Sequence, residues 1–234
     1  MNPNFFNALM IGSINDMRYF IERDPACVNV KSDNGSTPVM IAVKAAKIDA
    51  IKCLVEYGAD LNTRDDEDFS PIDIAAISGR IEIIKCLAFH GADLHARNHN
   101  GQTAIFVAAT KGKAESVKCL ASLGAEVDVR DKDNKTPMFN AAQAGHIECI
   151  RCLEALDADV NEIEPVVGMT PMFVAAGDGQ SASINCLASL GADVNAKSKN
   201  GMTPIFLAAA EGKIESVKCL VALGANSASS ARVI

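Results

Sequence analysis

The sequence has few aromatic residues and no long apolar segment. Among its 234 residues there is no tryptophan, and there are two tyrosines and nine phenylalanines, although 49% of the residues are hydrophobic. A core built from aromatic clusters is therefore excluded, and small side chains must fill the spaces between closely packed helices. No stretch approaches the roughly 18 consecutive apolar residues of a membrane span, so we do not expect membrane insertion.

An excess of positive charge is also missing. The chain carries 22 basic and 29 acidic residues, for a net charge of −7. Binding to nucleic acid requires a concentrated basic surface, so we do not expect nucleic acid as a partner. The first residues lack the basic flank and the small-residue cleavage site of a secretory signal. We therefore expect a cytoplasmic protein with reduced cysteines, the nucleus being the alternative compartment.

The sequence motifs of common catalytic sites are absent. There is no glycine-rich phosphate loop, no His-Glu-x-x-His motif and no nucleophile elbow. Carboxylates do recur three residues before basic residues, as in Glu82 and Lys85, but on a helix this spacing makes solvated ion pairs rather than acid–base dyads. We therefore expect no enzymatic activity and no cofactor.

Two groups of residues could be considered as metal ligands. Cys149, Cys152 and His146 form a half-site without a second ligand pair of complementary spacing. In the other group, His95 and His99 would be about 13 Å apart in an extended chain, which is too far for shared coordination. We therefore expect no metal site.

The most informative feature is an internal repeat of 33 residues. The pair Thr37-Pro38 recurs with steps of 33 residues and one step of 34. Its later copies are Ser70-Pro71, Thr103-Ala104, Thr136-Pro137, Thr170-Pro171 and Thr203-Pro204. The same steps separate a column of cysteines, Cys53, Cys86, Cys119, Cys152, Cys186 and Cys219. A period of this length predicts a solenoid of stacked units.

Each copy of the repeat predicts two short helices and an extended segment. In residues 98–130, Thr103 is suited to cap a first helix and Gly112 to end it in a tight turn. Residues 113–123 have helical apolar spacing, and Gly124 ends this second helix. A polar segment, the finger, then leads to the next copy. One such unit cannot bury its own apolar side, so neighbouring units must stack.

These motifs resemble the ankyrin repeat family. The pattern of the family occurs here as Gly201, Thr203-Pro204, Ala208-Ala209 and Gly212, preceded by Gly191-Ala192-Asp193-Val194-Asn195. The resemblance covers residues 1–226. It implies an all-α solenoid of stacked helix-turn-helix units with extended, β-hairpin-like fingers, and a partner protein or peptide bound on the concave face formed by the fingers and first helices.

The resemblance thus predicts a non-catalytic protein–protein interaction scaffold. The alternative is a regulatory or substrate-recruiting segment of a larger protein, such as an enzyme, a channel or a pathogen effector. We expect one domain over residues 1–227, followed by a flexible tail over 228–234. The expected units are a cap repeat over 1–31 and repeats over 32–64, 65–97, 98–130, 131–164, 165–197 and 198–227. The last helix has the apolar composition of an internal repeat, which predicts that further chain covers it or that the protein self-associates there.

One position departs from the family pattern. The family usually has histidine two residues after the proline, whereas this chain has Met40, Asp73, Phe106, Phe139, Phe173 and Phe206. We expect the four phenylalanines to form a buried aromatic column between repeats. The cysteine column should likewise be buried. Its members are too far apart for disulfides, because successive packed helices lie about 8–10 Å apart.

Two sets of residues are candidates for partner binding. The first is an apolar group near the expected finger tips, Ile163, Val166, Val167, Met169 and Met202, with Phe69 further along. Exposed apolar clusters mark interfaces, although the extra residue of the 34-residue step could instead fold Val166 and Val167 onto the stack. The second set is basic, Arg64, Arg97 and Arg130, either facing an acidic ligand or paired with Asp65 and Asp131. We also expect His99 to be exposed and to contact the partner.

The resemblance also implies a modification. Asn62, Asn161 and Asn195 lie in Asp-Leu/Val-Asn segments similar to the sites of asparaginyl hydroxylation in ankyrin repeats. The alternative is that these side chains only form hydrogen bonds in the finger turns.

The irregular repeat over residues 165–197 should be the least stable. It follows the 34-residue step, contains Gly177 in its first helix, and has Ser181-Ala182 in place of the usual Ile-Glu. These changes lower helix propensity. We therefore predict that amide hydrogen exchange, measured by mass spectrometry, is fastest in the helices of this repeat. The regular repeat over 98–130 is the internal reference, and uniform protection across both would contradict the prediction.

Overall fold

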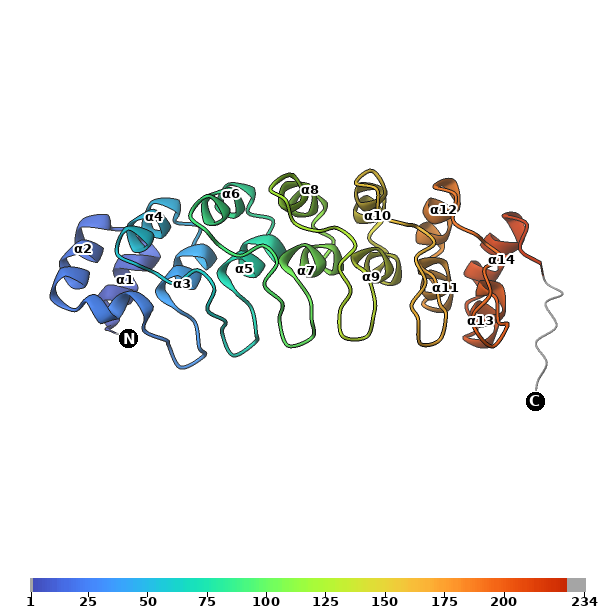
Figure 1. Cartoon of the computed structure of the whole chain (residues 1–234), viewed down its shortest axis with the longest axis horizontal. Coiled ribbons are helices and arrows are strands. Elements are labelled where there is room, and N and C mark those ends of the chain that lie inside the picture. Colours follow the sequence, from blue (N-terminus) through green and yellow to red (C-terminus); the bar gives the residue numbers. More distant parts are fainter. Residues whose placement is uncertain (1, 227–234) are drawn as a thin grey trace.

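The computed structural model describes residues 2–226 and shows helical hairpins stacked in a single row (Figure 1). The first helices are α1 (Pro3–Ile11), α3 (Pro38–Lys44), α5 (Pro71–Ile77), α7 (Ala104–Thr110), α9 (Pro137–Ala144), α11 (Pro171–Gly177) and α13 (Pro204–Ala210). The second helices are α2 (Ile14–Arg23), α4 (Ile48–Glu56), α6 (Ile81–Phe89), α8 (Ala114–Ser122), α10 (Ile147–Glu154), α12 (Ser181–Ser189) and α14 (Ile214–Ala222). A 3-10 helix, η1 (Pro25–Asn29), follows α2. The all-α repeat fold predicted from the sequence is confirmed.

The Thr-Pro pairs begin the first helices. The residue before the proline has an extended backbone and is the N-cap, and the proline occupies the first turn, where its missing N–H costs nothing. At α9, Oγ1 of Thr136 accepts a hydrogen bond from the backbone N of Phe139 at 3.3 Å. The α9 helix ends at Gly145, whose φ of 79° is the left-handed conformation that glycine adopts without strain.

The hydrophobic core runs along the whole stack without a break. First helices pack on neighbouring first helices, and second helices pack on neighbouring second helices. Paired alanines, such as Ala108 and Ala109, are fully buried in the first helices. Because an alanine side chain is short, it allows adjacent helices to approach closely. The repeats are therefore joined by continuous packing rather than separated into independent domains.

The prediction of a four-residue phenylalanine column is correct for three members. Phe106, Phe139 and Phe173 are buried between repeats, whereas Phe206 is 42% exposed. The reason is positional: within residues 2–226 no further repeat packs against α13. Asp73 occupies the same column and is also buried. Its burial raises the pKa of its carboxyl group, although hydrogen bonds from Ser70 and the charge of Arg64 oppose this shift.

The last described repeat leaves part of its apolar surface uncovered. Ile214 and Val221 on α14 are exposed together with Phe206. A hollow of about 250 Å³ lies beside Phe206 and Val221, lined in part by Ile205, Ala209 and Val217. Coverage by further chain or by a second copy stays a prediction. The predicted flexible tail over 228–234 lies outside the described residues.

The fingers connect consecutive repeats and extend along one edge of the stack (Figure 1). No strand is present among residues 2–226. Each finger tip is instead closed by backbone hydrogen bonds, one of which joins N of Ser32 to O of Ser36 (3.0 Å) in the first finger. Later tips use Asp65 and Phe69, Asn98 and Gln102, Asp131 and Lys135, Glu164 and Met169, and Ser198 and Met202. We number these tips as fingers 1 to 6.

The helices themselves are short. Within the described part of the chain, none is long and apolar enough to cross a membrane.

Four members of the cysteine column are buried as predicted, whereas Cys86 and Cys219 are partly exposed. The thiols of the column should react slowly. Burial raises the pKa of each of these thiols. Outside the column, it raises the pKa of the fully buried Cys149 to about 12. Since the thiolate is the nucleophile, we predict slow labelling of the folded protein by a disulfide reagent, with the partly exposed Cys86 and Cys219 reacting first.

The labelling is followed by absorbance, with guanidinium-unfolded protein as the reference for all eight thiols. The Cys86→Ala/Cys219→Ala variant should lose the early phase. Rapid labelling of Cys149 in the folded protein would contradict this account.

Candidate functional site

The finger tips are held by the side chain of the residue that opens each turn. In finger 4, Oδ1 of Asp131 accepts hydrogen bonds from the backbone N of Asp133 and of Lys135, both at 2.9 Å. In finger 5 the turn is one residue longer, and the opening residue is Glu164. Its carboxylate accepts from the backbone N of Val166 and of Val167. The longer glutamate side chain therefore spans the turn that contains the extra residue.

This turn projects its valines into solvent. Val166 is 68% exposed, Val167 39% and the neighbouring Ile163 54%. The alternative that the extra residue folds Val166 and Val167 onto the stack is therefore wrong. Met169 is partly buried and lines the same cavity as the valines, and Met202 is partly buried in finger 6. The physical reason is that Glu164 turns its carboxylate inward to bond the turn, which leaves the tip side chains to point outward.

A cavity of about 440 Å³ lies between fingers 4 and 5. Its lining includes Lys132, Lys135, Phe139, Val166, Val167 and Met169. The size falls within the range of roughly 300–1,000 Å³ that is typical of ligand pockets. The cavity therefore combines an apolar wall from finger 5 with a charged wall from finger 4, which carries Lys132, Lys135 and Asp133.

The predicted arginine column supports the fingers. Nη1 of Arg97 donates to O of Gly101 (2.8 Å) in its own finger and to O of Arg130 (2.6 Å) in the next. Nη1 of Arg130 donates in the same way to O of Asn134 (2.8 Å) and to O of Ile163 (3.4 Å). Each of these arginines joins a tip to the following finger. This structural role explains why arginine occurs at the position, without any need for an acidic ligand.

The arginines do not pair with the carboxylates considered from the sequence. Arg130 forms its ion pair with Glu162, and Asp131 instead bonds its own turn. Asp65 pairs with Lys44, with 3.3 Å between Oδ2 and Nζ.

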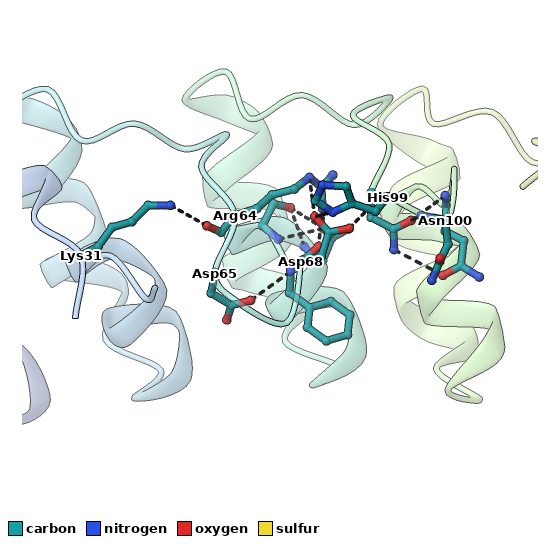
Figure 2. A network of polar contacts seen from close by, with 11 residues as sticks. Lys31, Arg64, Asp65, Asp68, His99 and Asn100 are labelled. Carbon is teal, nitrogen blue, oxygen red and sulfur yellow. Dashed lines mark hydrogen bonds and ion pairs between the residues drawn. The ribbon is translucent and has the colours of Figure 1, made fainter. Parts of the chain in front are cut away.

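Arg64 lies in a polar network that joins fingers 2 and 3 (Figure 2). Its Nη1 lies 2.9 Å from Oδ2 of the buried Asp73 and donates to the backbone O of Asp68. Asp68 in turn accepts from the backbone N of His99, and its Oδ1 lies 2.8 Å from Nδ1 of that histidine. Lys31 reaches O of Arg64 at 3.0 Å from the preceding finger. Arg64 is therefore committed to the network, whereas the His99 side chain remains 88% exposed at its surface.

The predicted binding residues do not form one continuous surface. Phe69 is half-buried and packs against the core at finger 2. The network of Arg64 and His99 and the whole of fingers 3 and 4 lie between it and the valines of finger 5. The structure brings together Val166, Val167 and Met169, and it separates Phe69 from them.

The three asparagines predicted as hydroxylation sites hydrogen-bond the next repeat. Oδ1 of Asn62 accepts from N of Asp93 at 2.9 Å, and Oδ1 of Asn161 accepts from N of Asp193 at 2.8 Å. Oδ1 of Asn195 accepts from N of Asn226 at 2.8 Å. These bonds join consecutive repeats, as in the alternative considered from the sequence. Hydroxylation itself stays a prediction.

The cavity-lining residues Lys132, Lys135 and Phe139 were not among the binding residues predicted from the sequence. Asp128, which occupies the asparagine column, was not predicted either. Burial and the nearby charge of Asp159 raise the pKa of the Asp128 carboxyl group, against the opposing effects of Arg130 and a backbone hydrogen bond. The signal for Asp128 was available, because it stands at the position of Asn62 and Asn161 in the period.

We predict that Asp128→Asn stabilises the protein at neutral pH. A carboxyl group whose pKa is raised on folding favours the folded state below its ordinary pKa, and this contribution is lost as the pH rises through the raised value. The amide keeps an acceptor oxygen and removes the charge. Because Asp128 is exposed and solvent screens its charge, we expect a gain of only about 0.5 kcal/mol.

The free energy of unfolding is measured by urea titration at neutral pH and again below the ordinary pKa of aspartate, where the gain should vanish. The reciprocal variant Asn161→Asp, which places a carboxylate beside Asp193, should be destabilised at neutral pH. A loss of stability in Asp128→Asn at neutral pH would contradict the assignment.

Comparison with known proteins agrees with the architecture. The sequence matches the family model described as ankyrin repeats (3 copies) over residues 5–98, 73–164 and 154–230. No curated protein matches the chain in sequence. Together the three matched segments extend from residue 5 to residue 230, and the described helices and fingers follow the same period. The chain belongs to the ankyrin repeat family.

Proposed function

We propose that this chain is a non-catalytic scaffold that binds a partner protein through its fingers, centred on finger 5. Ankyrin repeats generally mediate protein–protein interactions. The observation that carries the proposal is the exposure of Ile163, Val166 and Val167 on the longest finger. Elsewhere on the tips the residues are mostly polar or charged. An apolar cluster with a polar surround is the usual composition of the central part of an interface.

The surroundings of the valines support the same surface. The tip of finger 5 is held by Glu164 and is tied to finger 6, where N of Lys199 donates to O of Val167 at 2.9 Å. The valines are therefore presented by an ordered turn, which lowers the entropic cost of binding. The cavity beside them offers space for a side chain of the partner.

The proposal is tested by replacing Val166 and Val167 with aspartate. The double variant should lose partner capture by about tenfold or more, since unpaired charges would be buried in an apolar contact. Both side chains are solvent-exposed, so the folding of the stack should be unchanged. Capture by immobilised protein from a cell extract is quantified by mass spectrometry for the wild type and for the variant.

The matched control is Phe89→Asp. Phe89 is 85% exposed at the end of the second helix α6, away from the finger tips. This variant removes an equally apolar surface side chain and should retain the captured proteins. If the wild type, the Val166/Val167 double variant and Phe89→Asp capture the same proteins equally, the binding surface lies elsewhere.

A further inference from the structure

Neighbouring finger tips are joined by a recurring backbone hydrogen bond. The residue after the turn-opening residue donates its N–H to a carbonyl in the preceding tip. N of Asp66 lies 3.3 Å from O of Asn34, and N of Lys132 lies 2.9 Å from O of Asn100. Lys199 bonds finger 5 in the same way. Between fingers 2 and 3, the carboxylate of Asp68 takes the place of the carbonyl and accepts from His99 (Figure 2).

The junction between fingers 4 and 5 lacks this bond because of a proline. The residue after Glu164 is Pro165, which has no backbone N–H to donate. By the register of the other tips, the acceptor would be O of Asp133. Within residues 2–226 that carbonyl accepts no hydrogen bond from another part of the chain. The junction is therefore open, and the 440 Å³ cavity lies there.

The cavity is apolar at its base and along one wall. Phe139 and Val174, from α9 and α11, lie at its base, and Val166, Val167 and Met169 of finger 5 form the wall. A large apolar side chain placed there would contact carbon atoms on both sides. The cavity opens to solvent between the tips, where an extended segment could pass.

The charged side chains at the rim of the cavity differ in how free they are to contact a ligand. Glu164 lines the cavity, but the residue is only 7% exposed, and its carboxylate already accepts hydrogen bonds from two backbone N–H groups. Nζ of Lys135 lies 3.8 Å from Oδ2 of Asp133 and 5.9 Å from the ring centre of Phe139. Lys132 forms no ion pair with any described residue. The accessible rim therefore carries two positive charges and one negative charge, on a chain whose net charge is −7.

We propose that this cavity, the Pro165 pocket, binds an extended segment of the partner that carries a leucine or aromatic side chain next to an aspartate or glutamate. The apolar side chain fills the space above Phe139. The neighbouring carboxylate meets Lys132 and Lys135, and a backbone N–H of the segment donates to O of Asp133. Main-chain bonding of this kind is a general way of binding extended peptides. The proposal rests on the proposed function and specifies the chemistry of the partner.

The test uses a phage-displayed library of random peptides, selected on the immobilised whole protein. The enriched peptides should share an apolar residue adjacent to an acidic one. The best of them is then synthesised with a fluorescent label, and its binding is measured by fluorescence polarisation. A second peptide, with lysine in place of the acidic residue, serves as the charge-reversed probe.

Two variants probe the pocket directly. Val167→Asp should weaken binding of the acidic peptide by about tenfold or more, because a charge enters the apolar wall. Lys132→Glu/Lys135→Glu should weaken the same peptide by about tenfold and should bind the lysine peptide more tightly than the wild type does. Lys85→Glu/Lys118→Glu makes the same change in net charge on the second helices α6 and α8, and it should leave both affinities unchanged. Circular dichroism melting checks that each variant is folded.

Several results would overturn the Pro165 pocket. They are enrichment of basic peptides, binding that Val167→Asp leaves intact, equal effects of the two double reversals, or no enriched peptide at all. These results do not decide the proposed function. If proteins from a cell extract are still captured and are lost in the Val166/Val167 double variant, the finger surface binds a partner without using the pocket.

Discussion

The structure depends on one constraint, which is that no hairpin in this chain can bury its own apolar side. Each repeat has two short helices, and every internal repeat covers the apolar side of its predecessor. The contrast between Phe173 and Phe206 shows the effect of removing a neighbour. Both occupy the same position in the period, yet Phe173 is buried and Phe206 is 42% exposed. The stability of each repeat is therefore shared with those beside it.

The helices must keep the apolar side chains that pack between repeats. The repeats of this chain can therefore differ in their fingers, where a partner could bind. Every tip must satisfy its backbone N–H groups, and in fingers 2 to 5 the side chain at the turn-opening position accepts hydrogen bonds from them. Asp131 serves a turn of the regular length, whereas Glu164 serves the longer one. The additional residue thus leaves the stack undisturbed and changes only what the tip displays. Pro165 adds a second local change, since it removes the donor that would close the junction with finger 4.

The candidate site could be predicted in part from the sequence. The apolar residues Val166 and Val167 were identifiable because they interrupt a series of polar tips. Their exposure was not, since the same residues could have folded onto the stack. The ion-pair partners of Arg64 and Arg130 could not be predicted from the sequence either, because several carboxylates lie near each arginine along the chain. Only the side-chain geometry selects Asp73 for one and Glu162 for the other.

The sequence by itself determined the repeat length, the boundaries of the helices and the order of stacking. These features follow from local signals, the Thr-Pro caps, the turn glycines and the apolar spacing, and these signals recur in most copies. The tertiary structure decided which polar groups meet between neighbouring fingers and where a junction remains open. Such contacts join residues about one repeat apart through side-chain conformations, and no periodic pattern encodes them. The pocket between fingers 4 and 5 exists because a missing N–H and a longer turn occur at the same junction, and its shape depends on both together.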